Sequence, residues 1–167
     1  MMRSLTMICL VGALALGAMS CRDGDAQSVS SARNLAVQFH DAIQAADFDA
    51  ERILPLVDYP FLLDEVTVQD ERELMAALIK SKGAIRHAVS SARTMEVCSY
   101  EEFLDGKPVA GRSLDKDEAK RQARKIELRP GGILVRCYSD LKNDSRNYFL
   151  VMHPNRLGDL KITTFWD

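Results

Sequence analysis

The chain has 167 residues, of which 28% are charged and 47% are hydrophobic, and its formal charge is −2 at pH 7. This mildly acidic balance argues against nucleic acid as a partner, because binding to a phosphate backbone relies on clustered Lys and Arg. The length suits one domain whose hydrophobic core needs no disulfide framework.

Residues 1–20 are typical of a secretory signal peptide. Arg3 provides the positively charged start, and the stretch Leu5–Gly17 is apolar except for one threonine. That stretch is shorter than the roughly 20 apolar residues of a membrane-spanning helix. We therefore expect residues 1–20 to be removed, and we expect a polar tether at 21–31 followed by a single domain at 32–167.

The junction Ala18-Met19-Ser20-Cys21 resembles the lipobox of bacterial lipoproteins. In that class the cysteine sulfur is linked to diacylglycerol, and several acyl chains anchor the protein durably. The resemblance implies lipid attachment at Cys21 and a domain in the periplasm. Arg22 stands where an aspartate would hold such proteins in the inner membrane, which favours the outer membrane. The alternative is an ordinary secreted protein, cut near Ser20, in which Cys21 is incidental.

Two helices are predicted in the first half of the domain. Ser30 or Ser31 can cap a helix whose apolar side chains recur at helical spacing between Leu35 and Ile43. Further along the chain, Asp70-x-x-Glu73 has the spacing of a capping box and predicts the start of the second helix.

The middle of the domain alternates between strand and helix signals. The segment Thr94–Cys98 has the pattern of a short strand, and Ser99-x-x-Glu102 can cap a single turn. Asp115-x-x-Glu118 opens another helix, which carries many basic residues over 116–129. Such a segment could meet lipid headgroups or an acidic partner, but its interleaved acids favour an ordinary solvated face.

The last third of the chain is rich in β-formers. Runs at Ile133–Tyr138, Tyr148–Met152 and Leu160–Trp166 are joined by short, turn-like connections and predict an antiparallel meander. Helices first and a meander last are typical of the α+β class. We expect N-terminal helices packed on one face of a curved C-terminal antiparallel sheet.

This order of elements resembles the nuclear transport factor 2-like superfamily, in which a cone of helices covers a curved antiparallel sheet. The resemblance extends over residues 32–167. It is carried by Ala45–Asp49 at the end of the first helix, Asp58–Phe61 at the entry to the first strand, and Leu160–Ile162 with Trp166-Asp167 in the closing strand. It implies a cone-shaped pocket but no particular activity, because members include isomerases, hydrolases and catalytically silent binding domains.

Local motifs of common catalytic sites are missing from the sequence. It contains no nucleophile elbow, no phosphate-binding glycine loop, no Rossmann fingerprint and no HExxH-type zinc motif. The histidines His40, His87 and His153 are far apart, and a structural role is favoured over that of a general base. We expect no metal and no cofactor.

Cys98 and Cys137 are the only internal cysteines of the predicted domain. In an oxidising compartment they could form a disulfide, which would stabilise the fold by about 2–4 kcal/mol. Strand alternation places Cys137 on the inward face with Ile133, whereas Cys98 shares the outward face with Glu96. Residues on opposite faces cannot bond without a twist or a bulge, so both a disulfide and two separate thiols stay open.

The aromatic residues, among them Phe165, either fill the core or line a pocket, and such residues are more often core. The pocket that we predict would draw on Phe39, Tyr59, Phe61, Asp64, Tyr148 and Trp166. Under the cone fold, Asp58, Tyr59 and Asp64 lie near the mouth of the pocket. A buried tyrosine and a desolvated carboxylate are the groups with which isomerases of this fold polarise a carbonyl and move a proton.

These observations favour a non-enzymatic lipoprotein of the cell envelope. We expect the lipid anchor to tie it to the membrane, and its domain to bind a small apolar ligand or a partner protein. Two alternatives stay open. One is an isomerase or hydrolase of the same fold that uses a pocket carboxylate and a tyrosine, and the other is a structural accessory of an envelope complex.

Overall fold

A computed structural model describes residues 20–46, 48–90, 92, 94–107, 114–139 and 147–167, with the side chains of 20–26 left out. The predicted signal peptide lies outside these residues, and so does the side chain of Cys21. Within the described part of the chain, no helix has the length and apolar character needed to cross a membrane.

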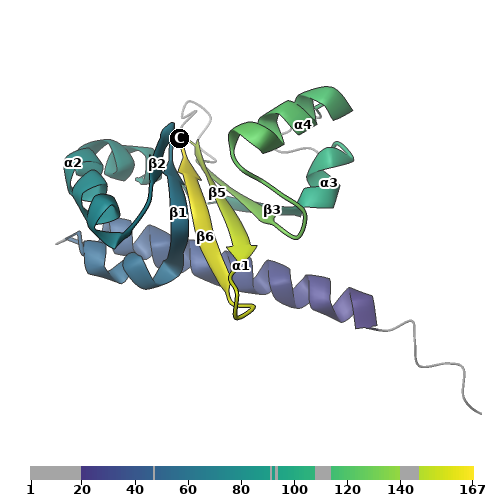
Figure 1. The fold of residues 1–167 in the computed structure, drawn as a ribbon, viewed down its shortest axis with the longest axis horizontal. Coiled ribbons are helices and arrows are strands. Elements are labelled where there is room, and N and C mark those ends of the chain that lie inside the picture. Colours follow the sequence, from purple (N-terminus) through teal and green to yellow (C-terminus); the bar gives the residue numbers. More distant parts are fainter. Residues whose placement is uncertain (1–19, 47, 91, 93, 108–113, 140–146) are drawn as a thin grey trace, which may run out of the picture.

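A six-stranded sheet forms the centre of the molecule (Figure 1). Its order is β2-β1-β6-β5-β4-β3, and every neighbouring pair is antiparallel except β1 and β6, which run parallel. The sheet is therefore mixed. The strands are β1 (Val57–Leu63), β2 (Val66–Val68), β3 (Thr94–Ser99), β4 (Ile133–Tyr138), β5 (Asn147–Pro154) and β6 (Leu160–Trp166).

Helices cover both faces of this sheet (Figure 1). The long α1 (Ser20–Gln44) and α2 (Glu71–Val89) lie on one face, together with the short 3-10 turns η1 (Ala50–Arg52) and η2 (Leu54–Leu56). On the other face lie α3 (Tyr100–Leu104) and α4 (Lys116–Lys125). The α+β class is confirmed. The N-terminal helices lie on one face of the sheet, as expected, but α3 and α4 also cover the other face.

The first face carries the larger core. Small residues at Ala32 and Ala36 are fully buried and let α1 approach the sheet closely. One turn further on, Phe39 lies 5.9 Å from Phe165, ring centroid to centroid, and Phe165 stacks on Tyr148 at 5.5 Å. Rings of this size exclude water from the space between helix and sheet. The interior on this face is thus filled by side chains.

The second face carries a smaller core under α3 and α4. Alternation along β4 explains the division, because Val135 belongs to the first core while its neighbour Leu134 belongs to the second. From the helices, Phe103 and Ala123 pack against this side of the sheet.

Helix α1 begins earlier than its sequence predicts. It starts at Ser20 and runs through the segment 21–31, which we expected to be a tether, so Ser30 and Ser31 are interior positions and not caps. At its other end, Arg86 of α2 donates hydrogen bonds to backbone carbonyls of the last turn and of the residues that follow. These bonds satisfy carbonyl groups that a helix end otherwise leaves unpaired.

Candidate functional site

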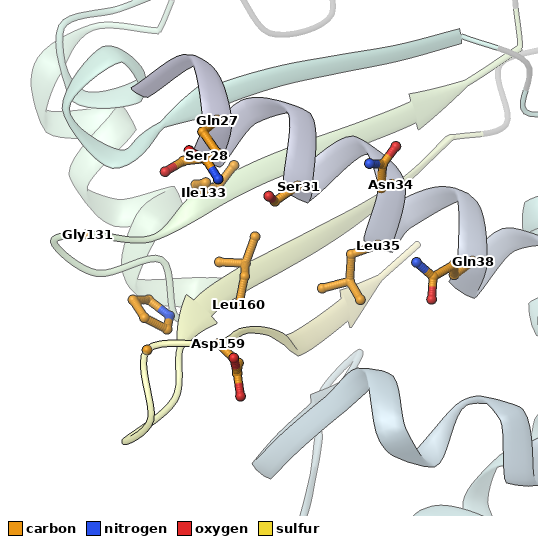
Figure 2. A pocket seen from close by; sticks show the side chains of 12 residues that line it. Gln27, Ser28, Ser31, Asn34, Leu35, Gln38, Gly131, Ile133, Asp159 and Leu160 are labelled. Carbon is orange, nitrogen blue, oxygen red and sulfur yellow. The ribbon is translucent and has the colours of Figure 1, made fainter. Parts of the chain in front are cut away.

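An open groove with a volume of roughly 670 Å³ lies between α1 and one end of the sheet (Figure 2). Its volume falls within the range of about 300–1,000 Å³ that is common for ligand sites. We call it the α1 groove. It is lined by Gln27, Ser28, Ser31, Asn34, Leu35, Gln38, Gly131, Ile133, Pro154, Gly158, Asp159 and Leu160.

The helix wall of the α1 groove is a polar stripe. Gln27, Ser31, Asn34 and Gln38 are spaced by three or four residues, which places them on one side of α1. Figure 2 shows these side chains one after another along the helix, with Leu35 among them. The adjacent side of the helix is the one that packs on the sheet. The same spacing rule thus produces a buried stripe and a polar stripe next to each other.

Two turns shape the sheet wall of the α1 groove. Gly131 (φ 76°) precedes β4, and Gly158 (φ 88°) lies in the β5–β6 connection, each in a backbone conformation that side chains disfavour. The Asn155 side chain accepts hydrogen bonds from the backbone N–H groups of Leu157 and Asp159, both at 2.9 Å. The first turn ends just before Ile133 and the second just before Leu160, and both side chains line the groove (Figure 2).

The chemistry of the α1 groove suits binding more than catalysis. Asp159 is the one ionisable side chain in the lining, and it is exposed. A lone exposed carboxylate has neither the partner nor the desolvation that tunes a general acid or base. The amides and hydroxyls of the helix wall both donate and accept hydrogen bonds. They can hold an uncharged polar ligand whose apolar parts rest on aliphatic side chains.

Half of the pocket that the sequence predicts is solid core. Phe39, Phe61 and Tyr148 are all at most 1% exposed and pack within the first core. The Tyr148 hydroxyl lies 3.2 Å from Nδ1 of His40, and burial raises the pKa of Tyr148. These aromatic residues therefore follow the core alternative, and they line neither of the two cavities described here.

Tyr59, Asp58 and Asp64 line neither the α1 groove nor the second cavity described below. Burial raises the pKa of Tyr59, whose hydroxyl is buried without a hydrogen-bond partner among the described residues. The Asp58 carboxylate accepts a hydrogen bond from the Tyr59 backbone N–H at 2.9 Å. Asp64 instead accepts from the backbone N–H of Asp167 at 3.0 Å. The arrangement lacks the shared reaction site that the isomerase alternative requires.

Trp166 belongs to the opposite face of the sheet from the other aromatic candidates. It is half-buried against the second core, and Nζ of Lys125 lies 4.5 Å from the centre of its ring. That distance is within reach of a cation–π interaction. Trp166 therefore joins α4 to the sheet and cannot share a pocket with Phe39.

The two internal cysteines are free thiols, so the disulfide alternative is wrong for this structure. Cys98 belongs to the second core and Cys137 to the first, on opposite faces of the sheet as strand alternation predicts. Cys98 is nevertheless buried, because α3 and α4 cover the face that we expected to be outward. Burial raises the pKa of Cys98 to about 12 and that of Cys137 to about 11.

Among the described residues, no group of three or more His, Cys, Asp or Glu side chains could hold a metal ion. His40 and His153 each have a structural contact that explains their position. His40 meets Tyr148 as described above, and the His153 ring lies 3.1 Å, Nε2 to O, from the backbone carbonyl of Glu127. His87 is exposed on α2.

The sequence prediction did not find the α1 groove. The signal that marks its helix wall is the recurrence of uncharged polar residues from Gln27 to Gln38, beginning in the segment that we expected to be a tether. Nothing local marks Gly131 or Leu160 as their neighbours, since only the tertiary fold brings these residues together.

No protein-family model and no curated protein matches the chain. Among solved structures, the chain is similar to a variant of Rd1NTF2_05, a designed protein of the nuclear transport factor 2-like type, with 14% sequence identity and a TM-score of 0.38. The similarity covers 82% of this chain and 96% of that one. The α+β assignment rests on the sheet order and the helix layers described above, and membership of the superfamily stays a prediction.

Proposed function

We propose that the protein is a non-enzymatic, membrane-anchored lipoprotein of the cell envelope that holds an extended segment of a partner protein in the α1 groove. The single observation that carries the proposal is the lining of this groove, which combines uncharged polar and aliphatic side chains. The proposal chooses the partner protein over the small apolar ligand, because the core under α1 is filled by aromatic side chains.

A peptide segment fits the α1 groove for a chemical reason. A peptide backbone is neutral and presents donors and acceptors in alternation, which side-chain amides such as those of Asn34 and Gln38 can satisfy together. The aliphatic side chains of Leu35, Ile133 and Leu160 then offer places for apolar side chains of the partner.

The position of the α1 groove suits a protein anchored through Cys21. Gln27, at one end of the groove lining, follows Cys21 by six residues along α1. At 1.5 Å per helical residue, this distance is about 9 Å. A partner bound there would lie close to the membrane surface, which is where an envelope lipoprotein acts.

Site-directed photo-crosslinking of the full-length protein in its native host tests the groove. We expect a photoreactive residue at Gln38 to give a discrete adduct with one protein, and one at the exposed Gln122 of α4 to give none. The Gln38 adduct should be lost in the Leu35→Arg variant, which puts charge into the groove. It should persist in Leu157→Arg, because Leu157 is exposed and outside the groove lining.

Two results would contradict the groove proposal. One is an adduct that survives Leu35→Arg in a protein whose thermal unfolding shows it to be folded. The other is equal crosslinking from Gln38 and Gln122. The anchor is tested separately through the intact mass of membrane-extracted protein, which should equal that of residues 21–167 plus acyl groups. A Cys21→Ser variant should move to the soluble fraction, and its retention on membranes would overturn the anchor.

A further inference from the structure

A second cavity lies beside the outer strand β3, on the other side of α1 from the α1 groove. Its volume is roughly 290 Å³, and we call it the β3 cavity. Strand β3 ends the sheet order, so one of its two edges has no neighbouring strand among the described residues. The cavity is lined by Arg33, Met95, Glu96, Val97, Cys98, Lys107, Leu134 and Arg136.

The lining of the β3 cavity is positively charged. Three cationic side chains come from separate parts of the chain, namely Arg33 from α1, Lys107 from the segment after α3 and Arg136 from β4. Two of them are paired with carboxylates, because Nζ of Lys107 lies 2.8 Å from Oε1 of Glu102 and Nη1 of Arg136 lies 3.4 Å from Oε2 of Glu96. Three cations against these two carboxylates leave a net positive charge, which favours a negatively charged group in the space between them.

Among these cationic side chains, Arg136 has a buried N–H donor that lacks an acceptor among the described residues. Its side chain is only 14% exposed, and Nη1 lies 3.4 Å from a carboxylate oxygen of Glu96. Its guanidinium also lies over the ring of Tyr138, 4.4 Å from the centre. The Nε of Arg136, however, is buried without an acceptor among the described residues. A buried donor left unpaired is costly, so an acceptor brought by a ligand would be bound favourably.

Alternate backbone groups of β3 point away from β4 along the same cavity. The Val97 carbonyl accepts from Nζ of Lys107 at 3.4 Å, and the Ser99 N–H donates to the Glu102 carboxylate at 3.0 Å. Both bonds lie outside the ladder with β4, so alternate residues of β3 direct their backbone groups to the open edge. The backbone of Met95 and the N–H of Val97 point the same way, toward the edge at which an added strand would pair, which is a common mode of peptide recognition.

We propose that the β3 cavity binds a carboxylate carried by an extended segment of a partner protein, and that this segment pairs with β3 as an additional strand. The carboxylate meets Arg136 with support from Arg33, while the backbone of Met95 and the Val97 N–H supply the backbone bonds. Arginine suits this role because its planar guanidinium offers several N–H groups to one carboxylate. The β3 cavity and the α1 groove share no lining residue, so this proposal does not depend on the proposed function.

The test uses the full-length protein in detergent micelles and a fluorescein-labelled probe, acetyl-Thr-Val-Glu-Val-Thr-amide, with binding followed by anisotropy. We expect the probe to bind, and its version with glutamine in place of glutamate to bind roughly tenfold more weakly. Arg136→Gln should weaken binding of the acidic probe by a similar factor of roughly ten, but not that of the glutamine probe. Arg121→Gln on the exposed face of α4 is the matched control and should change the affinity less than about twofold.

Two more variants keep the test decisive if Arg136→Gln fails to fold. Arg33 is more exposed than Arg136, and the Arg33→Gln variant should bind the acidic probe about threefold more weakly. Val97→Pro removes an outward N–H at an edge position where proline is tolerated, and it should abolish binding of both probes. Equal binding of the two probes, no effect of Val97→Pro, or dimerisation of the chain through β3 in place of probe binding would overturn the proposal.

Discussion

His153 connects the end of β5 to the segment after α4, and its environment makes stability depend on pH. Burial lowers the pKa of His153, so the folded state favours the neutral ring more than the unfolded state does. A group whose pKa is lowered by folding contributes stability above its unfolded pKa, about 6.5, and that contribution is lost as the pH falls toward the folded value.

We predict that the free energy of unfolding decreases as the pH falls from about 7 to about 5, and that His153→Gln makes this decrease shallower. Urea unfolding at several pH values measures both slopes. The His87→Gln variant removes a different, exposed histidine, and its slope is measured for comparison. An unchanged slope in His153→Gln would show that other groups cause the pH dependence.

Single residues also show where sequence reasoning succeeds. Strand alternation places Cys98 and Cys137 on opposite faces, and it separates Phe165 from its neighbour Trp166 in the same way. It could not tell that Cys98 is buried, because the covering helices come from other parts of the sequence. A period of two residues identifies a face but not the layer packed against it.

Among the elements, the starts of α2, α3 and α4 are well predicted, whereas the start of α1 is not. Asp70 accepts from the Glu73 N–H at 2.9 Å, and Asp115 accepts from the Glu118 N–H at 2.8 Å, as their spacing predicts. Ser99 and Glu102 form a reciprocal capping box. A cap is a contact between residues three apart, so the local sequence contains all of it.

We predict that Asp115→Ala lowers the free energy of unfolding by about 1 kcal/mol, because it leaves two N–H groups of α4 without their acceptor. Urea denaturation of the variant and the wild type gives the difference. Asp105→Ala is a control, since Asp105 is exposed and follows α3 without capping its start. A loss below about 0.3 kcal/mol in Asp115→Ala would mean that α4 is held by packing alone.

Elements that depend on distant partners were predicted less well. The short β2 was missed, because three residues offer little pattern and its pairing with β1 defines it. The parallel pairing of β1 with β6 has no local signal either, since about 100 residues separate the partners. The α1 groove depends on the same kind of long-range meeting, between a helix and turns far along the chain.

At the scale of the whole molecule, the main finding is a sheet buried on both sides. Leu150 of β5 represents the core under α1 and α2, and Leu134 of β4 represents the core under α3 and α4. Both are at most 1% exposed. If the second core stabilises the fold as much as the first, truncating either leucine should lower the free energy of unfolding by a similar amount.

We predict that Leu134→Ala and Leu150→Ala each lower the free energy of unfolding by about 2–5 kcal/mol, the range for buried leucines. Chemical denaturation followed by circular dichroism and by Trp166 fluorescence checks both values. The two probes should report one transition in each variant. A loss under about 1 kcal/mol for Leu134→Ala alone would indicate that the helices of the second face add little stability.

The place of β6 between β1 and β5 has a consequence for the order in which the molecule can form. Neither neighbour can complete its ladder until residues 160–166 are present, and those residues follow every other element described here. A chain that is synthesised from its N-terminus therefore keeps its sheet divided until residues 160–166 have emerged. Until then the β1–β2 pair and the β3–β4–β5 meander have no strand between them through which they can join.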